Sequence, residues 1–262
     1  MRVSELLKLL EIAERVAREA GELLVRRPDD FILDQKSNKH DFATQMDHQS
    51  EALITERITA LRPDDGLLGE EGASRASKTG FTWVIDPIDG TVNYLYGIPG
   101  WCISIGVKDK EGFAVGVVYS PATQSLWKAA RGHGAFLNEK KIRCNDPVNL
   151  DDALVGTGFA YDKGKRIKQR ELVSDLLPRV RDIRRLGACA ADISMVGSGS
   201  LDAFIEAGVN EWDFAAAAVI ATEAGAKVTH FPVWNQTKLM VIVSGPALHP
   251  ALLASINAGD WA

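Results

Sequence analysis

Two aspartates directly follow a short apolar run, and their spacing suggests cation chemistry. Asp86 and Asp89 come after residues 81–85, with Pro87 between them. The run of β-branched and aromatic residues predicts a buried strand, and Pro87 predicts that this strand stops at Asp86, because proline lacks an amide hydrogen. Two carboxylates at such a place repel each other unless a cation joins them, and hard oxygen ligands favour Mg²⁺ or Mn²⁺ over Zn²⁺. The alternative is an acidic turn that merely ends a strand.

Further acidic residues stand at the edges of predicted elements. Asp41 and Asp47 bracket the start of a predicted helix, Glu70 lies in a Gly-Glu-Glu-Gly turn, and Asp213 precedes an alanine-rich helix. Each position also has a simpler explanation, because aspartate favours helix N-termini and glutamate is common in exposed turns. After Asp89, Gly90 predicts a tight turn into a helix whose free amides could hold a phosphate.

The elements that must position these residues follow from hydrophobic periodicity in the first half. Residues 4–25 predict an amphipathic helix with Ser4 as its N-cap, residues 34–41 an exposed loop, and residues 47–61 a second helix. Residues 66–72 predict a short strand that ends in an acidic turn. The later segments 101–108, 113–120, 126–130 and 134–137 alternate as antiparallel strands do, and they predict a meander.

A polar, turn-forming segment at 145–149 is the candidate boundary between two halves. Beyond it strands and helices alternate, which predicts a layered α/β arrangement. The predicted strands are 153–159, 201–205, 227–231 and 239–244, and the predicted helices are 167–177, 188–196, 214–224 and 248–256, while the segment 182–186 is assigned to neither.

Composition limits the class of protein. The chain has 262 residues, of which 46% are hydrophobic and 25% charged, as in ordinary globular proteins. Its net charge of −5 gives no reason to expect nucleic acid as a partner. Three cysteines without a C-x-x-C motif, no signal-like N-terminus and no long apolar window predict a soluble cytoplasmic protein without a membrane partner.

Four ordered motifs together resemble the inositol monophosphatase family of magnesium-dependent, lithium-sensitive phosphatases. Trp-Val-Ile-Asp-Pro-Ile-Asp-Gly-Thr-Val-Asn at 83–93 resembles its first signature. Glu-Trp-Asp followed by small residues, at 211–226, is similar to its second. The segments 41–47 and 69–71 resemble two shorter motifs upstream.

The resemblance implies an αβαβα sandwich, α/β in class, that assembles as a homodimer. Its N-terminal half, 1–145, would have a mainly antiparallel sheet and most of the metal ligands. The smaller C-terminal α/β half, 146–262, would carry Asp213 and residues of the substrate pocket, and the two would form one compact catalytic unit.

The resemblance also implies two or three Mg²⁺ ions, which Mn²⁺ could replace. Glu70, Asp86 and the carbonyl of Ile88 would hold the first ion. Asp86, Asp89 and Asp213 would hold the second, and Glu70 would contribute to a third.

Catalytic and substrate roles are implied in the same way. Thr91, linked to Asp47, would orient the attacking water together with Glu70. The residues implied to contact the phosphate or the hydroxyl groups of the substrate are Asp89, Gly90, Thr91, Gly187, Ala188 and Glu206.

The substrate stays open at this point. A small phosphorylated polyol, myo-inositol 1-phosphate above all, is implied because Glu206 is present. Histidinol phosphate, fructose 1,6-bisphosphate, adenosine 3′,5′-bisphosphate and NADP are alternatives, and so is a regulatory protein-binding role in RNA synthesis. Two departures from the family pattern concern the pocket: Glu211 precedes Trp212 and predicts another negative charge there, and Cys189 replaces a small residue.

Overall fold

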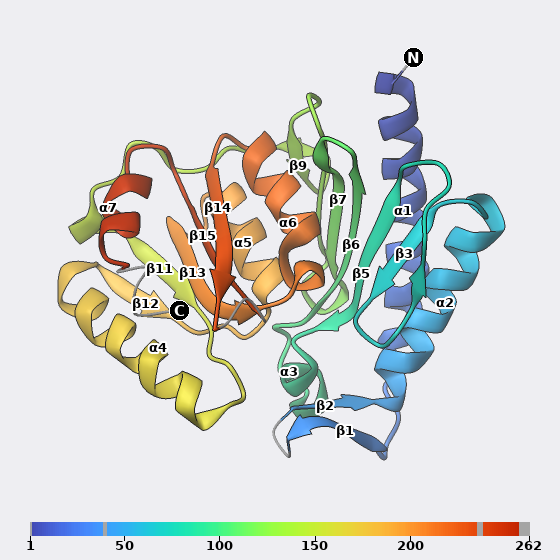
Figure 1. Cartoon of the computed structure of the whole chain (residues 1–262), viewed down its shortest axis with the longest axis horizontal. Helices are drawn as coiled ribbons and strands as arrows, with labels where there is room; N and C mark the ends of the chain where they lie inside the picture. The colour runs from blue at the N-terminus through green and yellow to red at the C-terminus, as the bar shows by residue number, and fades with distance from the viewer. Residues whose placement is uncertain (1, 39–40, 235–237, 257–262) are drawn as a thin grey trace.

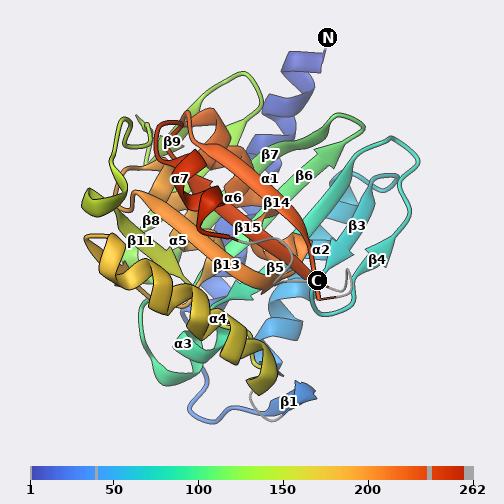
Figure 2. The same cartoon turned by 60° about the vertical axis from the view of Figure 1, so that its left-hand side comes forward.

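Helices and sheets alternate in five layers in the computed structural model, which describes residues 2–38, 41–234 and 238–256 (Figure 1). An outer pair of helices covers a large sheet, an inner pair separates that sheet from a smaller one, and a second outer pair covers the far face of the smaller sheet (Figures 1 and 2). The pairs are α1 (Arg2–Leu24) with α2 (Gln45–Leu61), α5 (Cys189–Gly197) with α6 (Glu211–Glu223), and α4 (Lys163–Leu176) with α7 (His249–Ala254). The predicted αβαβα sandwich is confirmed.

The large sheet has eight strands in the order β10-β9-β8-β7-β6-β5-β3-β4, and only β3 and β5 run parallel. The predicted antiparallel meander is therefore correct. Its strands are β3 (Gly66–Gly69), β4 (Ser74–Arg75), β5 (Thr82–Asp89), β6 (Cys102–Asp109), β7 (Gly112–Ser120), β8 (Ser125–Ala130), β9 (Ala135–Leu137) and β10 (Lys140–Lys141).

Strand β5 does not stop at Asp86, which corrects the sequence-based expectation. It continues through Pro87 to Asp89, with a β-bulge: Asp86 pairs with Ser104 and Asp89 with Cys102, so that one strand has an extra residue. Proline is tolerated because a bulge leaves a residue outside the hydrogen-bonded ladder. In a regular strand, residues three apart face opposite sides. The extra residue turns both carboxylates toward the same pocket.

The small sheet is mixed, in the order β12-β11-β13-β15-β14. Its strands are β11 (Leu154–Thr157), β12 (Asp182–Arg184), β13 (Ala203–Val209), β14 (Lys227–Val233) and β15 (Lys238–Ser244). All of them come after the 145–149 segment, and all strands of the large sheet come before it. The division into two halves at residue 145 stays a prediction.

Two local expectations in the first half are wrong. Helix α1 already begins at Arg2, so Ser4 lies inside it and is not its N-cap. The predicted loop 34–41 is largely a hairpin, in which β1 (Leu33–Asn38) pairs with β2 (Asp41–Thr44), while residues 39–40 lie outside the described ranges. The hairpin lies beside the short helix α3 (Thr91–Tyr96) (Figure 1). Its polar sequence hid the pairing, because strand signals depend on apolar alternation.

Three apolar clusters hold the layers together. The first joins α1 and α2 to the large sheet and includes Trp83 and Ile54. The second surrounds α5 and α6, and the third lies under α4 and α7. A fully buried aliphatic or aromatic side chain stabilises the fold by about 1.5–3 kcal/mol, so these contacts fix the layer spacing. Within the described ranges no helix is long and apolar enough to cross a membrane.

Candidate functional site

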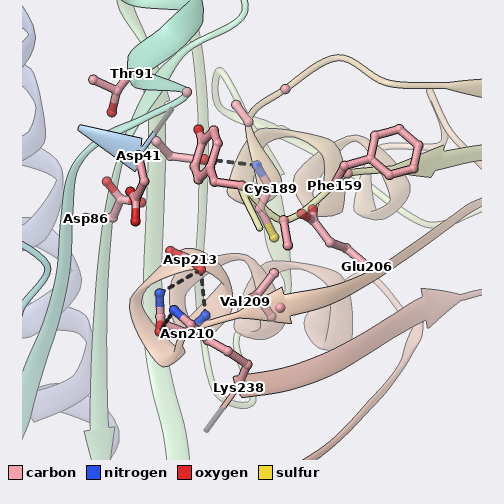
Figure 3. A pocket seen from close by; sticks show the side chains of 18 of the residues that line it. Asp41, Asp86, Thr91, Phe159, Cys189, Glu206, Val209, Asn210, Asp213 and Lys238 are labelled. Atoms are coloured by element: carbon pink, nitrogen blue, oxygen red, sulfur yellow. Dashed lines mark hydrogen bonds between the residues drawn. The ribbon is translucent and has the colours of Figure 1, made fainter. Parts of the chain in front are cut away.

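The predicted site residues converge on one pocket of ≈ 390 Å³ between the two sheets (Figure 3). Its wall is built from β5, the start of α3, the starts of α5 and α6, and β13. This volume is typical of sites that bind small molecules. With the exception of Asp47, every residue to which the sequence assigned a role lines it: Glu70, Asp86, Ile88, Asp89, Gly90, Thr91, Gly187, Ala188, Glu206 and Asp213.

Three carboxylates from three separate elements meet in this pocket. Oxygen atoms of Glu70, Asp86 and Asp213 all lie within 4.8 Å of one another. Burial, and then repulsion by Glu70, raises the pKa of Asp86 and the pKa of Asp213 well above the ordinary aspartate value. A set of hard, crowded carboxylate oxygens fits a divalent cation, which would remove this repulsion.

Asp213 owes its position to a helix cap. It is the third residue of α6, where its Oδ2 atom accepts a hydrogen bond from the backbone amide of Asn210 at 2.6 Å, and Asn210 is the N-cap (Figure 3). The sequence offered Asp213 as the N-cap of a helix that begins at residue 214. In the structure the helix begins at Glu211, and Asn210 is its N-cap. The other carboxylate oxygen of Asp213 remains available to the pocket.

Asp89 stands apart from this group of three. Its Oδ1 atom accepts a hydrogen bond from the amide of Cys189 at 3.0 Å, and its Oδ2 atom accepts one from the amide of Ala190 at 2.6 Å. Burial raises its pKa to about 7, although these amides at the start of α5 work against the shift. The Cys102 thiol also donates to Oδ2, at 3.5 Å, so the second lone pair of Oδ1 gives Asp89 its remaining acceptor capacity toward a cation or a hydroxyl group.

Asp47 lies behind Thr91 and reaches the pocket through it. The Thr91 hydroxyl lies 3.1 Å from Asp47 Oδ1 and 3.0 Å from the carbonyl oxygen of Ile88. Asp47 is the third residue of α2, and its Oδ2 atom accepts hydrogen bonds from the amide and hydroxyl of Thr44 at 2.8 Å and 2.6 Å. Burial raises the pKa of Asp47. The arrangement gives Thr91 a fixed proton acceptor.

Gly90 is required where the chain leaves β5. Its φ of 91° is left-handed, and a Cβ atom there would lie 2.8 Å from the carbonyl oxygen of Gly100 and 3.2 Å from Ala188 Cβ. Only glycine combines that backbone angle with such a close approach. This turn starts α3 at Thr91, as predicted, with the first amides of the helix beside the pocket.

The far side of the pocket is formed by the second half of the chain. Figure 3 shows Glu206 across the pocket from Asp86 and Thr91, with Cys189 between them. Burial raises the pKa of Glu206 to about 8, and Arg185 opposes the shift. Gly158 leaves room for the Glu206 carboxylate, which would overlap any Cβ atom at that position.

Several pocket residues were missed from the sequence. Lys36 Nζ lies 2.8 Å from Glu70 Oε1, and although burial opposes it, the ion pairs with Glu70 and Glu71 raise the pKa of Lys36. Lys36 belongs to β1, in the segment for which the sequence predicts an exposed loop. Arg185 and Asp192 also line the pocket. Asp192 lies one helical turn after Ala188, and this spacing was the available signal.

The expected negative charge of Glu211 is not in the pocket. Its carboxylate pairs with Lys108 Nζ at 2.5 Å, and it does not line the pocket. Lys238 does, and its Nζ donates to Asn210 Oδ1 at 2.6 Å. The sequence could not show which side of α6 the first residue of the helix would face.

Known proteins resemble this chain in sequence and in architecture. The inositol monophosphatase family profile matches residues 5–258. The chain is 40% identical to an inositol-1-monophosphatase of Mycobacterium bovis over 271 residues, covering 95% of this chain and 93% of the relative. It is 36% identical to the Nus factor SuhB of Pseudomonas aeruginosa over 261 residues, covering 95% and 96%.

A solved structure of an IMPase/NADP phosphatase, complexed with Mg²⁺ and phosphate, superposes with a TM-score of 0.82 at 25% identity, and 97% of each chain is covered. Ordered motifs, layered fold and pocket carboxylates agree with these matches. The chain belongs to the inositol monophosphatase family.

Proposed function

We propose that this phosphatase hydrolyses the phosphate monoester of a small polyol, with myo-inositol 1-phosphate as the leading substrate, in the presence of Mg²⁺. The observation that carries the proposal is the meeting of Glu70, Asp86 and Asp213 within 4.8 Å in a pocket large enough for such a substrate. Together with Asp89 and the carbonyl of Ile88, these residues would hold the cations. Bound Mg²⁺ supplies Lewis-acid activation of water and neutralises phosphate charge.

The chain's own groups then orient the reaction. When Thr91 donates its proton to Asp47, its hydroxyl oxygen can accept a hydrogen bond from a water molecule. That contact and the carboxylate of Glu70 would aim a lone pair of the water at phosphorus. Asp47 is itself held by two hydrogen bonds from Thr44, which position the acceptor behind Thr91. The amides of Gly90 and Thr91 would contact the phosphate oxygens.

The leaving alcohol would lie toward Glu206, which faces Asp86 and Thr91 across the pocket, and would pass Gly187 and Ala188, which line the pocket beside Gly90 (Figure 3). The carboxyl group of Glu206 can exchange hydrogen bonds with hydroxyl groups of the leaving alcohol. Histidinol phosphate, fructose 1,6-bisphosphate, adenosine 3′,5′-bisphosphate and NADP share the phosphate chemistry and differ only in this part. A panel of these esters therefore tests the substrate.

The deciding experiment measures phosphate release from the panel, with and without Mg²⁺, by wild type, Asp86→Asn and Asp64→Asn. We expect Asp86→Asn to reduce Mg²⁺-dependent release by about 10³-fold, because several kcal/mol of charge stabilisation is lost. Asp64→Asn makes the same charge change at an exposed residue paired with Lys78 and should behave as wild type. Equal activity of wild type and Asp86→Asn would reject the proposed site.

A protein-binding role is the second candidate, favoured by relatives named Nus factor SuhB. The Asp86→Asn variant separates the two. A cellular phenotype of gene deletion that this variant restores without hydrolysis would support binding, whereas a phenotype that only active protein restores would support the phosphatase role.

Four finer properties stay predictions: the number of ions, inhibition by lithium, a cytoplasmic location and a homodimer. Titration calorimetry with Mg²⁺ or Mn²⁺ counts the ions, and light scattering gives the oligomeric state. Both measurements use the purified chain.

A further inference from the structure

Asp192 is a buried acid that lines the pocket. Neither the proposed hydrolysis nor the packing of the described residues explains why an acid is buried there. Asp192 lies on α5, three residues after Cys189 and four after Ala188, so all three share one face of the helix. All three line the pocket. The side chain of Asp192 is almost entirely buried, with 1% of the residue exposed.

The Oδ1 atom of Asp192 lacks a hydrogen-bond partner among the described residues. A buried polar oxygen without a partner destabilises the protein, and native structures rarely keep one. The other buried acids behave differently: Asp89 accepts two amides of α5, and Asp47 accepts two donors from Thr44. A donor from a bound molecule would satisfy the unpaired oxygen, and the pocket gives such a molecule access to this helix face.

We infer that Asp192 is a specificity-determining residue that accepts a hydrogen bond from a hydroxyl group of the leaving alcohol. The inference rests on the proposed function, because it assumes that the ester's alcohol occupies the side of the pocket formed by α5 and β13. Asp192 and Glu206 then form two acceptors for two hydroxyl groups. An alcohol with a single hydroxyl would leave one of them unsatisfied.

This pair of acids defines the substrate class more narrowly than the cation site does. Carboxyl oxygens accept hydrogen bonds from neutral hydroxyl groups. The wall therefore selects a polyhydroxylated alcohol. An aromatic or simple alkyl ester has no donor to offer and gains nothing from Asp192.

The test compares two esters in wild type and Asp192→Ala: myo-inositol 1-phosphate and phenyl phosphate, both with Mg²⁺. We expect the ratio of their kcat/KM values to fall by about 10- to 100-fold in the variant, because alanine removes the acceptor and a site built for a hydroxyl donor discriminates strongly by that hydrogen bond. Asp202→Ala is the matched control. Asp202 binds the backbone amide of Leu154 outside the pocket, so its variant should keep the wild-type ratio.

A second measurement stays decisive if the variant folds poorly. Monodeoxy analogues of myo-inositol 1-phosphate remove one hydroxyl group at a time from the substrate of the wild-type protein. We expect one hydroxyl, other than the one that depends on Glu206, whose removal lowers kcat/KM about 10-fold or more in wild type, with no further loss in Asp192→Ala.

The outcomes distinguish the inference from the function on which it rests. An unchanged ratio in a folded Asp192→Ala variant, or equal loss with both esters, would overturn the inference and leave the phosphatase proposal intact. Wild-type protein that needs no hydroxyl group beyond the one at Glu206 would overturn it as well. Wild-type protein that releases phosphate from neither ester would reject the proposed function itself, and the inference with it.

Discussion

At the scale of residues, the pocket concentrates buried acids that repel one another. Burial first, and then the other carboxylates, raises the pKa of Asp86, Asp89 and Asp213. Protons therefore compete with a cation for these oxygens near neutral pH. Cation binding should release protons, and this links catalysis, pH and stability at one site.

Substitution of Thr91 tests the proposal that its hydroxyl group orients the attacking water. Thr91→Ala removes the hydroxyl that lies 3.1 Å from Asp47 Oδ1, and kcat for myo-inositol 1-phosphate should fall by about 10²- to 10³-fold. Thr91→Ser keeps the hydroxyl and should retain most of the activity. Steady-state kinetics at saturating Mg²⁺ decides, and equal rates for the alanine and serine variants would contradict the role.

Glu206 gives the cation-free protein a pH-dependent stability of defined sign. Its pKa is about 8 in the folded protein and near 4.5 when unfolded, so the folded state holds the extra proton between these values. Stability is then fully present below about pH 4.5 and is lost as pH rises through about 8. With EDTA, the Tm of wild type should fall between about pH 5 and pH 8, and Glu206→Gln should reduce that fall.

The control for this prediction is Glu56→Gln at an exposed site. Calorimetry at several pH values compares the three proteins. If Glu206→Gln showed the same pH dependence as wild type, the buried position of this carboxylate would not be the cause.

At the scale of elements, helix starts place two of the acids. Asp47 and Asp213 are each the third residue of a helix, α2 and α6, whose N-cap, Thr44 or Asn210, they bond in a capping box. In a capping box the third residue of the helix accepts a hydrogen bond from the backbone amide of the N-cap. This bond satisfies the amide and also fixes the position of the carboxylate. The third helix start, α3, depends instead on the left-handed turn at Gly90.

A comparison of Gly90 with Gly80 separates the cost of a left-handed backbone angle from the effect of crowding at the pocket. Their φ angles are 91° and 90°, but a Cβ atom meets backbone only at Gly90. Both Gly→Ala variants should lose about 1–2 kcal/mol of stability for the left-handed angle. Only Gly90→Ala should also lose kcat/KM, by about 10²-fold, because the start of α3 moves. Thermal unfolding and kinetics of both variants test this, and an active Gly90→Ala protein would contradict it.

At the scale of the whole molecule, the distance between the large sheet and helix α6 sets the cation site. Asp86 belongs to the large sheet and Asp213 to α6, which packs against that sheet. Gly116 on β7 permits this approach, because a Cβ atom there would overlap the carbonyl oxygen of Ala216. Gly116 therefore influences the position of Asp213 at the cation site, although it does not line the pocket.

Gly116→Ala should consequently weaken both the fold and Mg²⁺ activation. Overpacking should cost about 1–3 kcal/mol, and the Mg²⁺ concentration for half-maximal activity should rise as Asp213 moves from Asp86. Gly106→Ala is the milder comparison, since its Cβ would lie 3.1 Å from the Ala216 nitrogen. Thermal unfolding and Mg²⁺ titration of both variants test the order. A stable Gly116→Ala protein with normal activation would refute it.

The sequence by itself determined most of the elements and the candidate residues of the site. Apolar periodicity, glycine and proline are local signals, so the helices α2 and α6 and the meander from β6 to β9 could be predicted within a few residues. The acids at 70, 86, 89 and 213 stood out for the same reason: each lies in a short motif at the edge of an element.

Only the tertiary structure decided which of these groups face one another. The bulge that turns Asp86 and Asp89 to the same side depends on pairing with β6, and the place of Lys36 depends on a hairpin of polar residues. Likewise, packing between the sheets aims Asp192 into the pocket and turns Glu211 away to Lys108. Side-chain direction is set by contacts between segments far apart in the chain, and no local pattern records it.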